Sequence, residues 1–209
     1  MKILLVDNYD SFVYNIVGLL RQCREEMDGI PEWDVVRNDR IPIGHMDGYD
    51  AIILSPGPGI PSEAGDMMRL IEQCAGSHPM LGVCLGCQAI AEYFGAGLCR
   101  LPLPRHGHRS RLEGIVAEDD LLGGMAGEEM LVGRYHSWVI DGNTIGEDSE
   151  LMITSRDEEG NIMSVSHRRL PVYGVQFHPE SINTPQGIRI VRRFLEIANK
   201  TALRATCPS

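Results

Sequence analysis

Short apolar segments alternate with amphipathic ones in the first half of the chain. Strand-like apolar runs cover residues 2 to 6, 33 to 37, 50 to 54 and 79 to 83. One amphipathic segment begins near Ser11, a suitable N-cap, and runs to about Cys23, and a second covers residues 64 to 74. The second segment places apolar side chains on one helix face: Met67, Leu70, Ile71 and Cys74. This alternation predicts parallel strands with helices on both faces of the sheet.

The pattern changes between residues 97 and 166, where short strand-like segments and glycine-rich turns replace the alternation. A smaller, mostly antiparallel layer is expected there. A further strand over residues 172 to 177 and a closing helix over 186 to 199 follow. We therefore expect one α/β domain over residues 1 to 199 and a disordered tail over residues 200 to 209.

Composition excludes several classes of function. The chain has 209 residues, 43% of them hydrophobic, which is enough for one domain with a sizeable core. A formal net charge of −10 argues against nucleic acid or an anionic membrane as partner, because both require clustered Lys and Arg. We see no apolar run of membrane-spanning length, no secretory signal and no disulfide-framework spacing among the six cysteines. A cytoplasmic location is expected.

Cys84 lies in the sequence Gly82-Val83-Cys84-Leu85-Gly86, between a strand-like and a helix-like segment. A Gly-x-nucleophile-x-Gly turn in this position is typical of a nucleophile elbow, which strains the central residue and leaves no room for flanking side chains. The N–H groups of the following helix would stabilise a thiolate. The motif predicts an activated thiol, and a small buried core residue is the alternative.

His178 and Glu180 follow the apolar segment 172 to 175, in Gln176-Phe177-His178-Pro179-Glu180. Ligand crevices in open α/β sheets form where strands end. A histidine there can transfer protons, and a carboxylate two residues later can orient its ring and stabilise the imidazolium. A surface His and Glu in a proline turn is the alternative.

A proline- and glycine-rich loop follows the strand-like run that ends at residue 54: Ser55-Pro56-Gly57-Pro58-Gly59-Ile60-Pro61. Because proline has no N–H, the loop's donors are the amides of Ser55, Gly57, Gly59 and Ile60. A rigid loop with bare amides suits an oxyanion hole. A tight turn without catalytic use explains the same composition.

Together these motifs resemble the class I (triad) glutamine amidotransferases, and more closely the small subunits of anthranilate synthase and aminodeoxychorismate synthase. The resemblance runs in order along almost the whole chain, through Asp7-Asn8-Tyr9-Asp10-Ser11-Phe12, residues 54 to 59, residues 61 to 65, residues 82 to 86, Arg134-Tyr135-His136-Ser137 and residues 174 to 182. It implies the flavodoxin-like fold of that family, with a central, mostly parallel sheet flanked by helices and a smaller antiparallel layer.

The resemblance also implies a role for individual residues. Cys84 would be the nucleophile, His178 the general base and acid, and Glu180 its orienting partner, with an oxyanion hole formed by the backbone amides of Gly57 and Leu85. The residues expected to hold glutamine are Gly57, Gly59, Gln88, Ser137 and Trp138.

The implied reaction is hydrolysis of L-glutamine through a γ-glutamyl thioester on Cys84. Lys2 and Lys200 are the only lysines, so a Gly-x-x-x-x-Gly-Lys phosphate loop is excluded and a pyridoxal Schiff base is disfavoured. With no second active site evident, the ammonia would pass to a chorismate-binding synthase, component I, for anthranilate or 4-amino-4-deoxychorismate synthesis. No cofactor or metal is expected in this chain, and Mg²⁺ is expected only in the partner. The choice between the tryptophan and folate pathways stays open, with a slight preference for folate from residues 7 to 12.

Two positions depart from the family pattern. Cys87 replaces a usual histidine and creates Cys84-x-x-Cys87, for which a zinc half-site, a reversible disulfide and simple packing in the first helical turn are the alternatives. Zinc is disfavoured because the chain has no second Cys-x-x-Cys pair. His108 stands where lysine is common, next to Arg109, which can supply the charge.

Other classes of protein share some of these features. In an α/β-hydrolase the acid precedes the histidine in the chain, whereas here Glu180 follows His178. A stand-alone cysteine hydrolase of another amide, an amidotransferase that serves a different synthase and a non-enzymatic binding module remain as alternatives.

Overall fold

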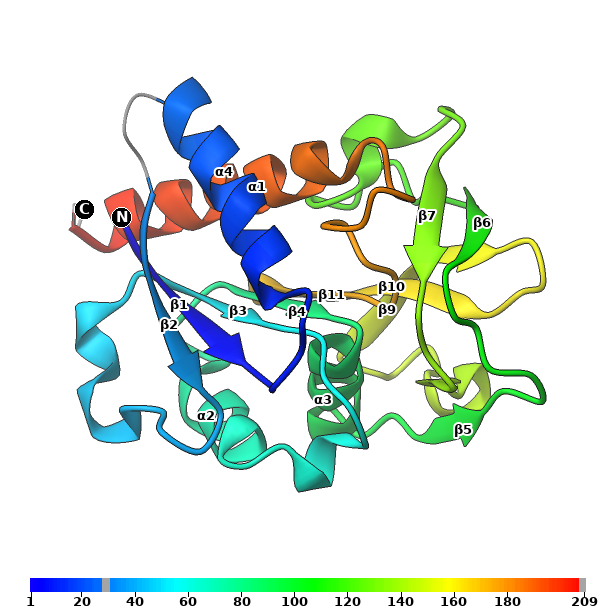
Figure 1. Cartoon of the computed structure of the whole chain (residues 1–209), viewed down its shortest axis with the longest axis horizontal. Helices are drawn as coiled ribbons and strands as arrows, with labels where there is room; N and C mark the ends of the chain where they lie inside the picture. Colours follow the sequence, from blue (N-terminus) through cyan, green and yellow to red (C-terminus); the bar gives the residue numbers. More distant parts are fainter. Residues whose placement is uncertain (28–30, 207–209) are drawn as a thin grey trace.

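Five parallel strands form one half of the central sheet in the computed structural model, which describes residues 1–27 and 31–206 (Figure 1). In spatial order they are β2 (Glu32–Arg37), β1 (Lys2–Asp7), β3 (Ala51–Leu54), β4 (Met80–Val83) and β11 (Val172–Val175). All residues of β3, β4 and β11 are buried, which is why these strands are continuous apolar runs without alternation. The strands predicted from the apolar runs are confirmed to within one or two residues.

Antiparallel strands extend the same sheet beyond β11, in the order β10 (Ile162–His167), β9 (Leu151–Asp157), β6 (His108–Glu113) and β7 (Leu131–Arg134). A separate two-stranded sheet pairs β5 (Leu98–Arg100) with β8 (Trp138–Ile140). The antiparallel region expected over residues 97 to 166 is therefore mostly continuous with the parallel half.

Helices cover both faces of the parallel half, as the alternation predicted. Ile3 and Leu5 of β1 pack in one core with α1 (Val13–Glu26) and α4 (Gly187–Thr206). Leu4 and Val6 point the other way, into a core formed with α2 (Met67–Cys74) and α3 (Leu85–Tyr93). Four short 3-10 turns complete the described elements: η1 (Ile43–Gly48), η2 (Pro61–Glu63), η3 (Gly123–Met125) and η4 (Gly142–Thr144). No helix of the described residues combines the length and apolar character that crossing a membrane requires.

Helix ends differ from the prediction at several places, and α1 runs to Glu26, beyond its predicted end near Cys23. Phe12, not Ser11, is the N-cap of α1, and the side chain of Asp10 instead accepts from the Phe12 N–H at 2.7 Å. The helix expected from residue 64 begins at Met67, because η2 precedes it and Gly65 has a positive φ of 54°.

The closing helix α4 runs to Thr206, beyond the predicted end at residue 199. The sequence contains no glycine or proline between residues 188 and 207 that would end it earlier. Residues 200 to 206, expected in a disordered tail, are therefore helical, and residues 207–209 of that prediction lie outside the described residues.

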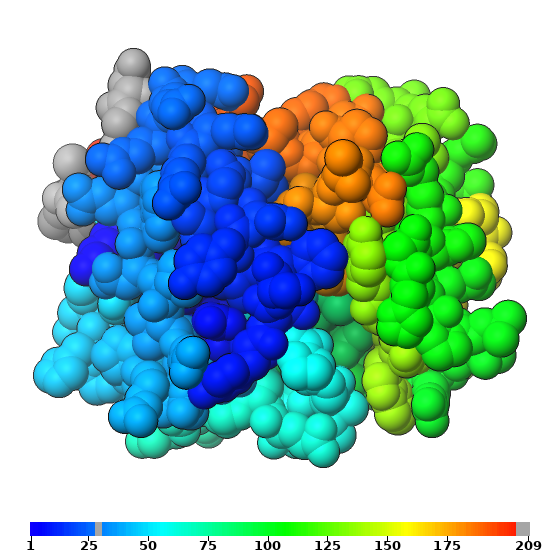
Figure 2. Space-filling view, in the orientation of Figure 1, coloured from blue at the N-terminus to red at the C-terminus, as the bar shows by residue number. Residues whose placement is uncertain are grey.

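The carboxyl ends of the parallel strands bring the sequence motifs to one edge of the sheet. The loops after β1, β3, β4 and β11 carry residues 8 to 12, residues 55 to 61, Cys84 and His178, respectively. In Figure 2 the orange segment that follows β11 lies between the dark blue segment that follows β1 and the green segments around β6 and β7. One face of the molecule therefore gathers the candidate chemistry from segments far apart in the chain.

Candidate active site

Cys84 occupies a strained turn between β4 and α3. Its φ of 52° and ψ of −102° lie in a region that residues other than glycine rarely adopt. The Cys84 N–H donates to the carbonyl of Val175 in β11 at 2.8 Å, so the neighbouring strand fixes the turn. The sulfur stands at the N-terminus of α3, where the helix dipole favours a thiolate.

The two glycines of the motif leave space for this turn. A Cβ on Gly82 would overlap the backbone of Gly86, and a Cβ on Gly86 would overlap the carbonyl of Leu54 in β3. Both neighbours are main-chain atoms, which cannot rotate away as a flexible side chain can. The motif therefore sets how closely α3 approaches the sheet.

Gly86→Ala should lower the free energy of unfolding by about 3 kcal/mol, because overpacking against backbone forces α3 away from β3. Gly18→Ala is the matched control, since Gly18 also lies in a helix but a Cβ there meets nothing within 4 Å. The control should be neutral or gain up to about 1 kcal/mol. Chemical denaturation of both variants measures the difference, and equal stabilities would contradict this view of the elbow.

His178 and Glu180 form a buried pair beyond the end of β11. The Nδ1 atom of His178 lies 2.7 Å from Oε1 of Glu180, and both side chains are almost completely buried. Burial lowers the pKa of His178, but the negative charges of Cys84 and Glu180 and hydrogen bonds to them outweigh this effect and raise it to about 10. The opposite ring nitrogen, Nε2, is buried without a hydrogen bond to nitrogen or oxygen, which leaves it available for proton exchange with Cys84.

Two aromatic rings enclose the histidine. Phe12, just before α1, and Tyr135, between β7 and β8, contact His178 edge-on with ring centroids 5.4 Å and 4.9 Å away. The backbone N–H of His178 donates to the carbonyl of Gly133 at 2.9 Å. These contacts hold the ring in one orientation and exclude water from it, a role that the sequence motifs alone did not assign to Phe12 or Tyr135.

The loop after β3 brings Gly57 against the elbow. A Cβ on Gly57 would lie 2.6 Å from Cδ2 of Leu85 and 2.6 Å from Cβ of Asn8, so only glycine permits this approach. The loop is anchored at its start, where the backbone N–H of Asn8 donates to Oγ of Ser55 and Nδ2 of Asn8 to its carbonyl, both at 2.9 Å. The two expected oxyanion donors, Gly57 and Leu85, are thus neighbours.

Two polar side chains, Gln88 and Gln176, connect the backbone of Trp138 to the Cys84 sulfur. Gln88 Nε2 donates to the Trp138 carbonyl at 2.9 Å and to Gln176 Oε1 at 3.1 Å. Gln176 in turn directs its Nε2 towards the Cys84 sulfur at 3.6 Å. Sequence reasoning did not assign Gln176 a role, although it lies in a quoted motif.

Two predicted glutamine-binding residues lie further out. Gly59 is exposed in the loop after β3 and has a positive φ of 77°. Ser137 is half-buried, and its carbonyl accepts from the Leu101 N–H at 2.8 Å. No hydrogen bond within the described residues joins either of them to the Cys84 sulfur, and their part in glutamine binding stays a prediction.

Cys87 and His108, the two departures from the family pattern, lie in different surroundings. Cys87 is fully buried, and its sulfur packs so closely on Gly174 of β11 that a Cβ there would come within 2.7 Å. Burial also raises the pKa of this thiol, which opposes formation of the reactive thiolate. These facts favour the packing interpretation of Cys87. His108 is exposed at the start of β6.

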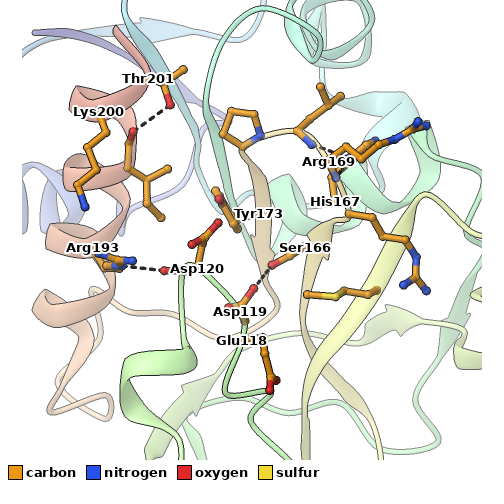
Figure 3. Close-up of a pocket in the computed structure, with 15 residues that line it drawn as sticks. Glu118, Asp119, Asp120, Ser166, His167, Arg169, Tyr173, Arg193, Lys200 and Thr201 are labelled. Atoms are coloured by element: carbon orange, nitrogen blue, oxygen red, sulfur yellow. Dashed lines mark hydrogen bonds between the residues drawn. The ribbon is translucent and has the colours of Figure 1, made fainter. Parts of the chain in front are cut away.

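A cavity of about 540 Å³ lies at the opposite end of β11, and none of the predicted site residues lines it (Figure 3). Its polar groups hold structure together: Ser166 donates to Asp119 at 2.5 Å, and Arg193 donates to the carbonyl of Asp120 at 2.7 Å. Its lining residues include no thiol beside a base. The candidate active site is therefore the Cys84 edge of the sheet.

Comparisons with known proteins agree with this geometry. The family model described as glutamine amidotransferase class-I matches residues 4–198. Anthranilate synthase component 2 of Lactococcus lactis is 39% identical over 95% of this chain and 96% of its own. The aminodeoxychorismate/anthranilate synthase component 2 of Bacillus subtilis is 38% identical over 96% of this chain and 99% of its own. A crystal structure from Thermoplasma acidophilum, assigned to one of the subunits of GMP synthase, superposes with a TM-score of 0.83, at 26% identity, and covers 99% of this chain and 98% of that one.

Proposed function

The chain belongs to the class I glutamine amidotransferases, and on that premise we propose that it hydrolyses L-glutamine with Cys84, His178 and Glu180 and passes the ammonia to a chorismate-using synthase. The observation that carries the catalytic part is the buried His178 and Glu180 pair, 2.7 Å apart, beside a thiol in a strained turn. Covalent thiol catalysis requires a nucleophile, a base beside it and a group that orients the base, and these three residues supply them in the proposal.

In the proposed reaction, the Cys84 thiolate attacks the side-chain carbonyl carbon of glutamine. The amides of Gly57 and Leu85 stabilise the negative oxygen. His178 gives a proton to the leaving nitrogen as the carbon–nitrogen bond breaks, which releases ammonia and leaves a γ-glutamyl thioester. His178 then takes a proton from water, which attacks the thioester and releases glutamate. Glu180 stabilises the imidazolium in both steps.

Substrate binding is proposed at the residues around this centre. Gln88 uses both of its N–H donors within the protein, and its Oε1 accepts no hydrogen bond from the described residues. That oxygen is suited to the amino group of glutamine. The backbones of Gly57, Gly59, Ser137 and Trp138 are proposed to hold the rest of the molecule. The reaction as written needs no cofactor in this chain, and any Mg²⁺ would serve the partner.

The synthase partner is inferred from the relatives. The relatives at 38–41% identity are named as second components of anthranilate or aminodeoxychorismate synthase. The structural neighbour assigned to GMP synthase is only 26% identical, which favours a chorismate-using partner over a nucleotide-using one.

Exposed apolar side chains beside the site support docking of a protein partner there. Ile182, two residues beyond Glu180, is 92% exposed, and Tyr14 at the start of α1 is 70% exposed. Isolated apolar side chains are ordinary on a surface, but these flank the segments that carry His178 and Phe12. A synthase that covers this face would receive ammonia without its loss to solvent.

The test is to purify the chain with each candidate component I and supply glutamine and chorismate. We expect glutamate to form in step with one aromatic product, anthranilate or 4-amino-4-deoxychorismate, and chromatography of the products identifies the pathway. No glutamate with any component I would contradict the proposed function, whereas glutamate with only a nucleotide-synthase partner would contradict the chorismate assignment.

Ile182→Glu adds a control for docking in the same assay. It should lower synthesis from glutamine while synthesis from added ammonium salt, which needs the synthase alone, stays constant. An equal effect on both ammonia sources would argue against this face as the partner surface.

A further inference from the structure

Arg134 is a buried cation at the end of β7, and none of its side chain is exposed. Its Nη1 pairs with Asp157 and donates to Ser110 Oγ at 3.1 Å. Its Nε donates to Nε2 of His136 at 3.1 Å. Because a guanidinium can only donate, Nε2 of His136 must accept, and the ring proton must be on Nδ1.

The Nδ1 atom of His136 lies 2.9 Å from the carbonyl oxygen of Trp138. With its proton on Nδ1, the ring donates to this carbonyl, so Arg134 fixes the direction of the bond. Burial and the charge of Arg134 lower the pKa of His136 to about 3, so the ring is neutral at neutral pH. His136 therefore differs from His178: it holds a single tautomer instead of exchanging protons.

The Trp138 carbonyl oxygen links His136 to the candidate site through hydrogen bonds. It accepts a second hydrogen bond from Gln88, which also donates to Gln176, the side chain beside the Cys84 sulfur. Both N–H donors of Gln88 are engaged, so its Oε1 can point in only one direction.

We propose that His136 is a positioning residue for glutamine: it fixes the Trp138 carbonyl, and through that carbonyl it orients Gln88 and the substrate-binding backbone at residues 137 and 138. The inference rests on the proposed function and deepens it. Such a residue acts by keeping the binding groups in place before substrate arrives. Its loss should weaken glutamine binding more than it slows the chemistry.

Two conservative variants separate this role from a structural one. His136→Asn places an amide N–H near the position of Nδ1, so it keeps the donor to Trp138 and loses the acceptor for Arg134. His136→Gln places its oxygen near the position of Nε2, so it keeps the acceptor for Arg134 and loses the donor to Trp138. Each variant therefore removes one of the two hydrogen bonds of His136 and keeps the other.

We expect His136→Gln to raise KM for glutamine about tenfold, with kcat within about threefold of wild type and an unchanged melting temperature. We expect His136→Asn to keep KM within about twofold but to melt several degrees lower, because buried Arg134 loses a partner. Steady-state glutaminase kinetics with the synthase partner provide KM and kcat, and thermal unfolding provides the melting temperatures.

The opposite pattern, with wild-type kinetics in His136→Gln and a raised KM in His136→Asn, would show that His136 serves only Arg134 and would overturn the inference. If His136→Asn does not fold, the KM of His136→Gln decides alone, because that variant keeps the partner of Arg134. A wild type without glutaminase activity would instead contradict the proposed function itself, so the two failures are distinguishable.

Discussion

Cys84→Ala should reduce ammonia release from glutamine by at least about 10⁴-fold, the largest loss we expect from one substitution. Among the cysteines that the structure describes, Cys84 is the one that the strained turn and the N-terminus of α3 hold beside His178. Without the thioester, a water molecule would have to attack an unactivated carboxamide, and removal of a nucleophile typically costs losses of this order. Glutamate formation with the synthase partner present is the measurement.

Two controls make this result specific. Synthesis by the partner from added ammonium salt should stay within about twofold of wild type, because that reaction does not use Cys84. Cys99→Ala removes the exposed cysteine of β5 and should leave glutaminase activity unchanged. If Cys84→Ala still released ammonia from glutamine, the proposed mechanism would be wrong.

Glu180→Gln should lower kcat by about 10³- to 10⁴-fold with a much smaller change in KM. An amide in place of the carboxylate can donate to Nδ1 of His178 at the position of the present 2.7 Å contact. The ring would then carry its proton on Nε2, the wrong tautomer to accept from Cys84, and the imidazolium would lose its buried counter-charge. Glutaminase kinetics measure the loss.

The same variant should also change the pH dependence of kcat. Glu180 is one of the groups that raise the pKa of His178, so its neutralisation lowers that pKa. In the proposed mechanism, the imidazolium that protonates the leaving nitrogen exists below this pKa, and the fall of kcat at alkaline pH should therefore move to lower pH.

Glu150→Gln is the matched control for Glu180→Gln. Glu150 lies 3.4 Å from a different histidine, His167, and the substitution should change neither kcat nor its pH profile. An unchanged alkaline limb in Glu180→Gln would contradict the role given to this carboxylate.

The parts of the fold that the sequence predicts are those set by local pattern. The continuous apolar runs of β3, β4 and β11 arise from burial on both faces, and the elbow follows from two glycines whose Cβ atoms would overlap backbone. The end of α4 was predicted too early, because no glycine or proline in this part of the sequence marks where the helix ends. The N-cap of α1 was missed because Asp10 satisfies the Phe12 N–H from outside the helix.

The parts of the site that sequence reasoning missed depend on contacts between distant residues. Arg134 pairs in the interior with Asp157 and Ser110, each more than twenty positions away along the chain. A buried arginine is indistinguishable in sequence from an exposed one, since only its partners decide where it lies. The motif that contains Arg134 and His136 gave the family resemblance, but its hydrogen bonds, and hence its role, required the three-dimensional arrangement.

The candidate active site is completed by β11, a strand from late in the chain. The strand enters late in the chain yet lies between β4 and β10, and its Val175 carbonyl accepts from the Cys84 N–H. Gln176, which faces the sulfur, is 92 positions from Cys84. While β11 has not yet emerged from the ribosome, Cys84 lacks both His178 and the hydrogen bond from its N–H to the Val175 carbonyl. Cys84 therefore acquires His178, Gln176 and the hydrogen bond that fixes its turn only after β11 has joined the sheet.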